Sequence, residues 1–322
     1  MILSKGTKAT RWLEFTFEPT GEPIRFPMGT IRGLGDGPRL VVSGGMHGSE
    51  YAGVEAAIRL YHEVDPAAIS GTLEVCMIYN LPAFQKNLGF VVPQDGKNPG
   101  ATFPGSLTGT YGEVMAYHMT QSVLSQADAY VELHGGDIPE ALTPFALAPV
   151  TGDAEVDARS RAMAIAYNLP IVVSRDTSDP AKPARSGFAT AALRGTPAIL
   201  VESGQQGILK MSEVETHMVG LRNILVHLGM VSGQIVNSVK RSFSSEHLAT
   251  KSDLEGMWYP AIAIGDTIQE GQVAGWIRDY FGNDMAEVKA PFTGFVSVVR
   301  TSPAVSAGNV LWEQDRIVGH EE

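Results

Sequence analysis

Along the first 240 residues, short apolar runs alternate with longer amphipathic stretches. The apolar runs predict buried strands at 40–42, 73–78, 129–133 and 198–201. The amphipathic stretches predict helices at 50–63, 110–126, 153–168 and 213–228. The first 35 residues differ and predict a strand pair, 12–17 and 24–31. The alternation predicts an α/β domain with helices on both faces of a mainly parallel or mixed central sheet.

The pattern changes after residue 241. Residues 242–251 are mostly polar, and their Ser, Thr, His and Glu predict a linker. Beyond it, short β-like segments are separated by glycines from Gly256 to Gly308, a spacing typical of a small all-β unit. We therefore expect two domains, an α/β domain at 1–245 and an all-β module at 252–322.

The charge of the chain limits its partners. Among 322 residues, 24 are basic and 35 acidic, which gives a formal net charge of −11. This acid excess argues against nucleic acid as the main partner. Charged residues make up 18% of the chain, below the roughly 25% usual in soluble domains. A thinly charged surface favours contacts between copies, so we expect a homo-oligomer.

No segment of the sequence indicates a membrane-spanning helix or an oxidising compartment. The longest apolar run is shorter than the 18 residues that a spanning helix needs. The first fifteen residues contain Lys, Thr and Arg too early for the apolar core of a signal peptide. The single cysteine, Cys76, has no partner for an internal disulfide. We expect a cytoplasmic protein without membrane contact.

Candidate chemistry begins where the strand at 40–42 ends. His47 and Glu50 follow it, three residues apart, at the start of a predicted helix, which places both side chains on one face of its first turn. Imidazole and carboxylate groups are both zinc ligands. Taken alone, the pair is more often a histidine at a helix start beside a solvated glutamate.

Two further strands end in the same way. The strand at 129–133 leads into His134, and Glu132 lies on the same face of that strand because side chains alternate. His134 could supply a third ligand, with Glu132 either holding its ring or exposed at the strand end. The strand at 198–201 leads into Glu202, a natural general base beside a metal-bound water and otherwise a cap or ion-pair partner. Three such strand ends are improbable by chance. The other histidines lack this setting, so we interpret them as structural or solvent-facing; they are His62, His118, His217, His227, His247 and His320.

These motifs resemble the succinylglutamate desuccinylase/aspartoacylase family of the wider zinc carboxypeptidase superfamily. The resemblance includes Asn-Leu-Pro-Ala-Phe at 80–84 and Asp-Gly-Lys-Asn at 95–98, followed by Phe-Pro-Gly at 103–105. It implies a zinc-carboxypeptidase-like α/β/α fold, one Zn²⁺ per chain and hydrolysis of the amide of N-acylated amino acids. It implies His47, Glu50 and His134 as zinc ligands and Glu202 as catalytic base. The bacterial deacylases that act on N-acetyl-diaminobutyrate are the most similar members.

The chain departs from the family pattern at two arginines. Gly-Ala at 100–101 replaces Asn-Arg, and Gly-Phe-Val-Val at 89–92 stands where an upstream arginine is usual. Those arginines would polarise the scissile carbonyl and clamp a substrate carboxylate. A dianionic substrate is therefore not expected. As substrate-binding residues we predict Lys97, Asn98 and Arg185, with Arg194 as an alternative cation.

The C-terminal module resembles a biotinyl/lipoyl-type β-sandwich. In such carriers a lysine at a hairpin tip receives the cofactor, but Asn283 stands at that position here. A carrier role is therefore not expected, because an amide cannot be acylated as a lysine is, and covalently bound lipoyl or biotin would indicate it. The same module recurs at the end of the deacylase family, where it covers the mouth of the active site, and we expect that role here.

We conclude that the sequence predicts a zinc-dependent deacylase for a small N-acyl amino acid. Two alternatives stay open. One is a non-catalytic relative that binds metal or ligand but has lost the electrophilic arginines. The other is a carboxypeptidase that acts on peptides.

Overall fold

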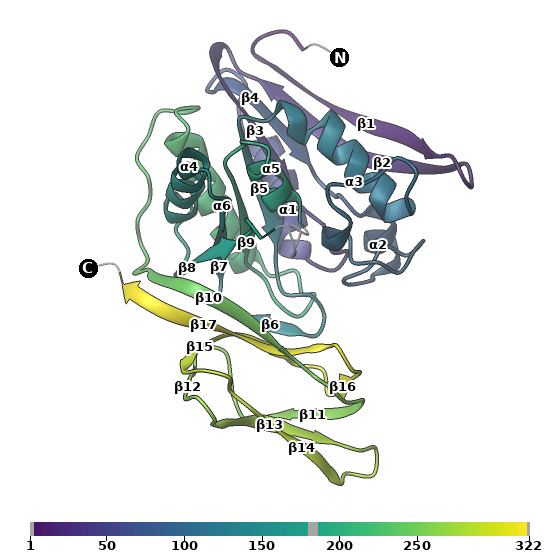
Figure 1. Cartoon of the computed structure of the whole chain (residues 1–322). Helices are drawn as coiled ribbons and strands as arrows, with labels where there is room; N and C mark the ends of the chain where they lie inside the picture. The colour runs from purple at the N-terminus through teal and green to yellow at the C-terminus, as the bar shows by residue number, and fades with distance from the viewer. Residues whose placement is uncertain (1–2, 180–185, 321–322) are drawn as a thin grey trace.

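The computed structural model describes residues 3–179 and 186–320, in which one long mixed sheet runs through most of the chain (Figure 1). Its strands lie in the order β1-β2-β4-β3-β5-β9-β7-β8-β10-β17-β15-β12, with β6 beside β15. In the α/β part they are β1 (Thr7–Phe17), β2 (Glu22–Arg32), β3 (Gly35–Ser43), β4 (Ser70–Cys76), β5 (Ala129–His134), β6 (Glu140–Leu142), β7 (Phe145–Val150), β8 (Ile171–Asp176) and β9 (Ala198–Glu202). The mixed α/β sheet confirms the predicted fold class.

The predicted helices are all present. They are α1 (Tyr51–Glu63), α3 (Tyr111–Ser122), α4 (Ala154–Ala166) and α6 (Met211–His227), joined by the short α2 (Leu81–Lys86) and α5 (Gly187–Ala192). Two single 3₁₀ turns lie at η1 (Gly100–Thr102) and η2 (Leu124–Gln126). The strand pair predicted near the N-terminus is also confirmed, because β1 and β2 pair antiparallel along their whole length.

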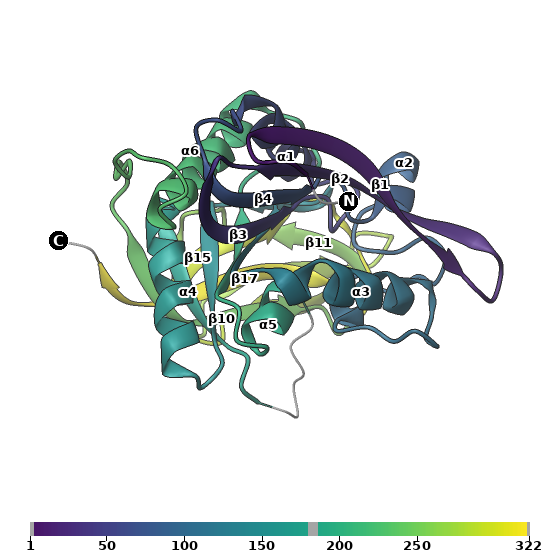
Figure 2. The ribbon, with the colours of Figure 1, turned by 90° about the horizontal axis from the view of Figure 1, so that it is seen from above.

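Helices cover both faces of the sheet. Apolar residues of α1, α4 and α6 form one core with one face of the strands. Residues of α3 and α5 form a second core with the other face. Figure 2 shows α1 and α6 on one side of the strands and α3 and α5 on the other. The central strands β3, β5 and β9 are therefore almost fully buried, as expected for near-continuous apolar runs.

The predicted linker at 242–251 is wrong: this segment is the strand β10 (Ser242–Lys251). It pairs in parallel with β8 at its start and antiparallel with β17 (Val310–His320) along its length. The composition misled because the one buried position of this strand carries a polar side chain, Ser244, whose hydroxyl donates to the backbone carbonyl of Glu246. The main sheet thus continues without a break into the C-terminal segment.

The remaining C-terminal strands are short, as predicted. They are β11 (Gly256–Pro260), β12 (Thr267–Ile268), β13 (Val273–Arg278), β14 (Asp284–Lys289), β15 (Gly294–Arg300) and β16 (Ala304–Val305). A second sheet has the order β14-β13-β11-β16. Between the two sheets lies a small core around Trp258 and Trp312, whose rings stack at 5.9 Å. The domain boundaries at 245 and 252 stay a prediction. None of the helices in the described part of the chain has the length and apolarity to cross a membrane.

Candidate metal centre and its cavity

Three neighbouring parallel strands bring the predicted site residues to one edge of the sheet. His134 ends β5 and Glu202 ends β9, and the two are register partners. His47 lies in the loop after β3, and Glu50 is the N-cap residue of α1. The carboxyl ends of parallel strands are the usual place for a site in open α/β sheets.

Tight packing fixes the loop that carries the first two residues. Gly48 stands between them and has no room for a side chain, because a Cβ there would lie 2.5 Å from the carbonyl carbon of Ala83 in α2. The Asn80 side chain caps α2 by accepting a hydrogen bond from the Ala83 N–H at 3.3 Å. The Asn-Leu-Pro-Ala motif thus supports the loop from behind.

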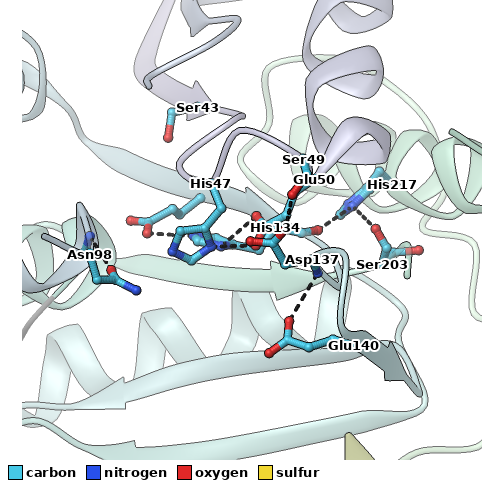
Figure 3. A network of polar contacts seen from close by, with 12 residues as sticks. Ser43, His47, Ser49, Glu50, Asn98, His134, Asp137, Glu140, Ser203 and His217 are labelled. Carbon is cyan, nitrogen blue, oxygen red and sulfur yellow. Dashed lines mark hydrogen bonds and ion pairs between the residues drawn. The ribbon is translucent and has the colours of Figure 1, made fainter. Parts of the chain in front are cut away.

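His47, Glu50 and His134 converge on one point. His47 Nδ1 lies 2.5 Å from Glu50 Oε1, and His134 Nδ1 lies 3.0 Å from Glu50 Oε2. One ligand atom from each residue falls within 4.8 Å of the others. Glu50 and His134 are buried and His47 is nearly so (Figure 3). The structure therefore brings together the three residues that the sequence singled out as ligands.

The protonation pattern of this group suits a cation. His134 Nε2 lies 3.0 Å from Glu132 Oε1, so the ring donates its proton to that carboxylate. With the ring neutral, Nδ1 and the Glu50 carboxylate are two acceptors 3.0 Å apart, and either a second ring proton or a bound cation would lie between them. Two imidazole nitrogens and a carboxylate oxygen are a donor set that Zn²⁺ binds well.

The charges of these groups depend on one another. Burial alone would raise the pKa of the Glu50 carboxyl, but the imidazoles of His47 and His134 lower it to about 2. Burial disfavours a charged His134, yet Glu50 and Glu132 raise its pKa well above the usual range. A metal ion replaces such a ligand-site proton when it binds.

Glu202 is close to this group, within the same cavity. Burial raises the pKa of its carboxyl well above the ordinary value; the nearby His134 opposes this shift and Glu50 adds to it. Among the described residues, its Oε2 atom has no hydrogen-bond partner. A carboxyl in this condition is suited to accept and release a proton.

The surrounding cavity has a volume of about 1050 Å³ and is lined by both parts of the chain. Residues from the α/β part include Phe90, Asn98, Glu140 and Phe188, and those from the C-terminal strands include His247, Lys251, Arg300, Asn309 and Glu313. The C-terminal segment therefore forms one wall of the site.

Only one of the predicted substrate-binding residues lines the cavity in the described part of the chain. Asn98 lines the cavity, and its Oδ1 accepts a hydrogen bond from the Gly100 N–H at 2.9 Å (Figure 3). Lys97 is directed elsewhere, with its Nζ 2.7 Å from Glu113 Oε1. Arg185 lies outside the described residues. Arg194 is exposed and is not part of the cavity wall. The cations that do line it are Arg175, Lys251 and Arg300, which the sequence analysis did not identify.

Two buried histidines support the site without lying in it as ligands. His217 Nε2 lies 3.0 Å from the backbone carbonyls of both His134 and Ser203, so its N–H ties α6 to the ends of β5 and β9. Burial lowers the pKa of His217 to about 4 and keeps it neutral. His247 lies between Glu313 and Asp315, with contacts of 2.8 and 3.2 Å. The structural interpretation of both histidines agrees with this placement.

A sequence profile of the succinylglutamate desuccinylase/aspartoacylase catalytic domain matches residues 36–228, more than half of the chain. The chain belongs to this family. The matched segment contains the three candidate ligands and Glu202, and it ends before the C-terminal strands.

Similar proteins agree with this assignment. The N-alpha-acetyl-L-2,4-diaminobutyric acid deacetylase of Halomonas elongata is 27% identical over an alignment of 289 residues, and the match covers 88% of this chain and 83% of that protein. The product-bound ectoine utilization protein EutE (DoeB) of Ruegeria pomeroyi has the same fold, with a TM-score of 0.85 at 22% identity, and the match covers 98% of this chain and 97% of the other. A succinylglutamate desuccinylase from a Silicibacter species gives a TM-score of 0.84 at 21% identity, over 97% and 95% of the chains.

Proposed function

We propose that the protein is a zinc-dependent amidohydrolase that removes the acyl group from a small N-acyl amino acid. The observation that carries the proposal is the convergence of His47, Glu50 and His134 within 4.8 Å, in one cavity with Glu202. The family assignment and the name of the Halomonas elongata relative support amide hydrolysis.

The residues divide the chemistry between them. His47, Glu50 and His134 would hold the zinc ion, which when bound lowers the pKa of a coordinated water and polarises the amide carbonyl. Glu202 accepts the proton of the attacking water at its free Oε2 and then delivers it to the nitrogen of the leaving amine. Its raised pKa lets the carboxyl hold that proton between the two transfers.

The cavity fits an amino acid derivative of modest size. Its volume is in the upper range of ordinary small-molecule sites. Arg175, Lys251 and Arg300 offer positive charge to a substrate carboxylate, away from the metal-ligand loop. We assign the catalytic residues to the 1–245 domain. We assign to the 252–322 module the role of covering the site, because Arg300, Asn309 and Glu313 line the cavity from that side.

The test combines metal content with turnover. The zinc-loaded wild type should hold one zinc per chain and hydrolyse at least one of a set of N-acetyl, N-formyl and N-succinyl amino acids, including N-acetyl-diaminobutyrate. Glu202→Gln should keep the zinc and lose about 10²-fold or more of kcat. Glu155→Gln, on an exposed face of α4, is the matched control and should behave as wild type.

Two results would contradict the proposal. A wild type that binds no zinc would remove the metal from the mechanism, and a fully active Glu202→Gln would remove the base. Zinc bound without hydrolysis of any substrate in the set would favour a non-catalytic binding protein, and cleavage of peptides in preference to acyl amino acids would favour a carboxypeptidase.

A further inference from the structure

We propose that Phe90 is a specificity-determining residue that restricts the substrate to N-acyl compounds with an uncharged acyl group. This inference rests on the proposed function and assigns one wall of the cavity to the acyl half of the substrate. It concerns the loop at 88–92, where the family pattern has an arginine and this chain has glycine and phenylalanine.

Phe90 lies directly beside the metal-ligand group. Its ring lines the cavity and meets the ring of His47 edge to face, with centroids 5.3 Å apart and planes inclined by 63°. The side chain is partly buried, so one face stays open to the cavity. If the scissile carbonyl of a substrate lies at His47, Glu50 and His134, the acyl substituent of that carbonyl would lie against the Phe90 ring.

The backbone holds Phe90 there in an unfavourable conformation. Its φ of 57° is in the left-handed region, which few residues other than glycine adopt. The Asp137 carboxylate lies against the backbone of this loop at Gly89, and it accepts a hydrogen bond from the Ile138 N–H at 2.8 Å. Strain of this kind persists where the surroundings fix it, and it is concentrated at functional sites.

The residues around the loop at 88–92 hold its backbone in place. Asp137 is completely buried and also bonds Ser49, next to Glu50. A Cβ on Gly89 would lie 2.2 Å from Asp137 Oδ2, so glycine is needed at that position. On the other side of Phe90, the Asn80 side chain donates to the Val91 carbonyl at 3.1 Å. Phe90 is therefore presented to the cavity by a loop that is tied to the ligand loop itself.

The cations of the cavity wall lie on one side of the sheet. Arg175, Lys251 and Arg300 belong to β8, β10 and β15, and these strands lie on one side of β3, β5 and β9, with β17 between β10 and β15. Carboxylates line this side as well, among them Glu140 and Glu313. The loop of Phe90 follows β4 and α2 in the chain, and β4 lies on the other side of β3. Among the described residues, the cations nearest to Phe90 in sequence are Lys86, which is exposed at the end of α2, and Lys97, whose Nζ is paired with Glu113; neither lines the cavity.

This division orients the substrate. The carboxylate of the amino acid half is stabilised toward Arg175, Lys251 and Arg300, which leaves the acyl half to the wall formed by Phe90, Asn98 and Gly100. An acetyl or propionyl group buries apolar surface against that ring. A succinyl group would place a second carboxylate there, where the described residues offer no cation, and an unpaired charge is costly to bury.

The test compares acyl groups in binding and in turnover. Acetate, propionate and succinate are titrated calorimetrically into the zinc-loaded protein, and kcat/KM is measured for the N-acetyl and N-succinyl forms of one amino acid. We expect the wild type to bind propionate at least about tenfold more tightly than succinate, with the same order in kcat/KM. Phe90→Arg should reverse the order in binding, and the apolar control Phe90→Leu should keep it. Thermal unfolding of each variant shows that it is folded.

The outcomes separate this inference from the proposed function. Equal binding of propionate and succinate by the wild type, or an unchanged order in a folded Phe90→Arg, would overturn the role of Phe90. Selective binding without hydrolysis would overturn the proposed function alone. Failure of the zinc-loaded protein to bind any of the three acids would overturn both.

Discussion

The Glu132 carboxylate and the Glu50 carboxylate lie on opposite sides of the His134 ring, each 3.0 Å from one of its nitrogens. Glu132 is itself fixed by the Phe188 N–H at 2.7 Å and the Tyr130 hydroxyl at 3.2 Å. It therefore determines the ring orientation and which nitrogen carries the proton. A carboxylate behind a ligating histidine also makes the histidine a better donor to the metal.

Replacing Glu132 should weaken zinc binding although Glu132 is not a ligand. Glu132→Ala should lower the zinc affinity about 10–100-fold, and Glu132→Gln by less, because an amide oxygen still accepts the His134 proton. Competition with a chelating dye measures the affinity, and Glu155→Gln serves as the surface control. A folded Glu132→Ala protein with wild-type zinc affinity would show that His134 needs no such support.

Replacing Lys97 should leave substrate binding unchanged. Its ammonium is paired with Glu113, which also closes the capping box of α3 through the Thr110 N–H at 2.8 Å. We expect Lys97→Met to keep KM within about twofold and to lower the free energy of unfolding by about 0.5 kcal/mol, as for other half-exposed ion pairs. Steady-state kinetics and chemical denaturation provide the two measurements. A tenfold rise in KM would restore Lys97 to the substrate site.

The metal group could be predicted because its determinants are local in the chain. His47, Glu50, His134 and Glu202 each follow an apolar run, and parallel strands end at a common edge of the sheet. The partner of Lys97 was also accessible from the sequence. Thr110 and Glu113 form the Thr-x-x-Glu pattern of a capping box, and this pattern places Glu113 at the start of a helix close to Lys97.

The rest of the cavity depends on contacts between segments distant in the chain, which no local sequence pattern predicts. The composition of 242–251 is that of a loop, and the segment becomes a strand because β8 and β17 offer it partners on both sides. Glu313 of β17 reaches the cavity beside this strand, where it pairs with Ala249 of β10. The loop of Phe90 packs at Gly89 against Asp137, which is distant in the chain and belongs to no motif that the sequence analysis identified.

The buried cluster around His247 should make stability depend on pH. Burial lowers the pKa of His247, but Glu313 and Asp315 of β17 outweigh this effect and raise it from 6.5 to about 10. On the other sides, the Phe145 ring of β7 packs against it, and Arg175 of β8 acts on Glu313. Because the pKa is higher in the folded state, the charged histidine contributes its full stability below pH 6.5 and loses it as the pH rises toward 10.

His247→Gln should therefore be most harmful at low pH. We expect the metal-free variant to lose about 3–5 kcal/mol of unfolding free energy at pH 6, the usual cost of breaking a buried charge pair, and a small fraction of that at pH 10. Denaturant titrations at several pH values give the difference from wild type. His62→Gln, on the exposed side of α1, is the control and should show no such trend. An equal deficit at both pH values would mean that His247 acts only by packing.

The C-terminal strands should be required for the α/β part to fold. A chain ending at residue 241 lacks β10, which pairs with β8 at residues 171–173, and lacks Phe243, over whose ring the Arg161 guanidinium lies at 4.6 Å. The edge of β8 would be left unpaired and apolar, an arrangement that promotes aggregation. We expect the shortened chain to be insoluble or to lack a cooperative transition, and the full chain to unfold in a single step. Calorimetry and size-exclusion chromatography test both statements.

Phe281→Ser, at a hairpin tip where the side chain is 92% exposed, is the control within the same segment and should leave the transition unchanged. A soluble 1–241 fragment with its own sharp transition would show instead that the α/β part is stable without β10, so that the shared sheet would contribute to the cavity and not to folding.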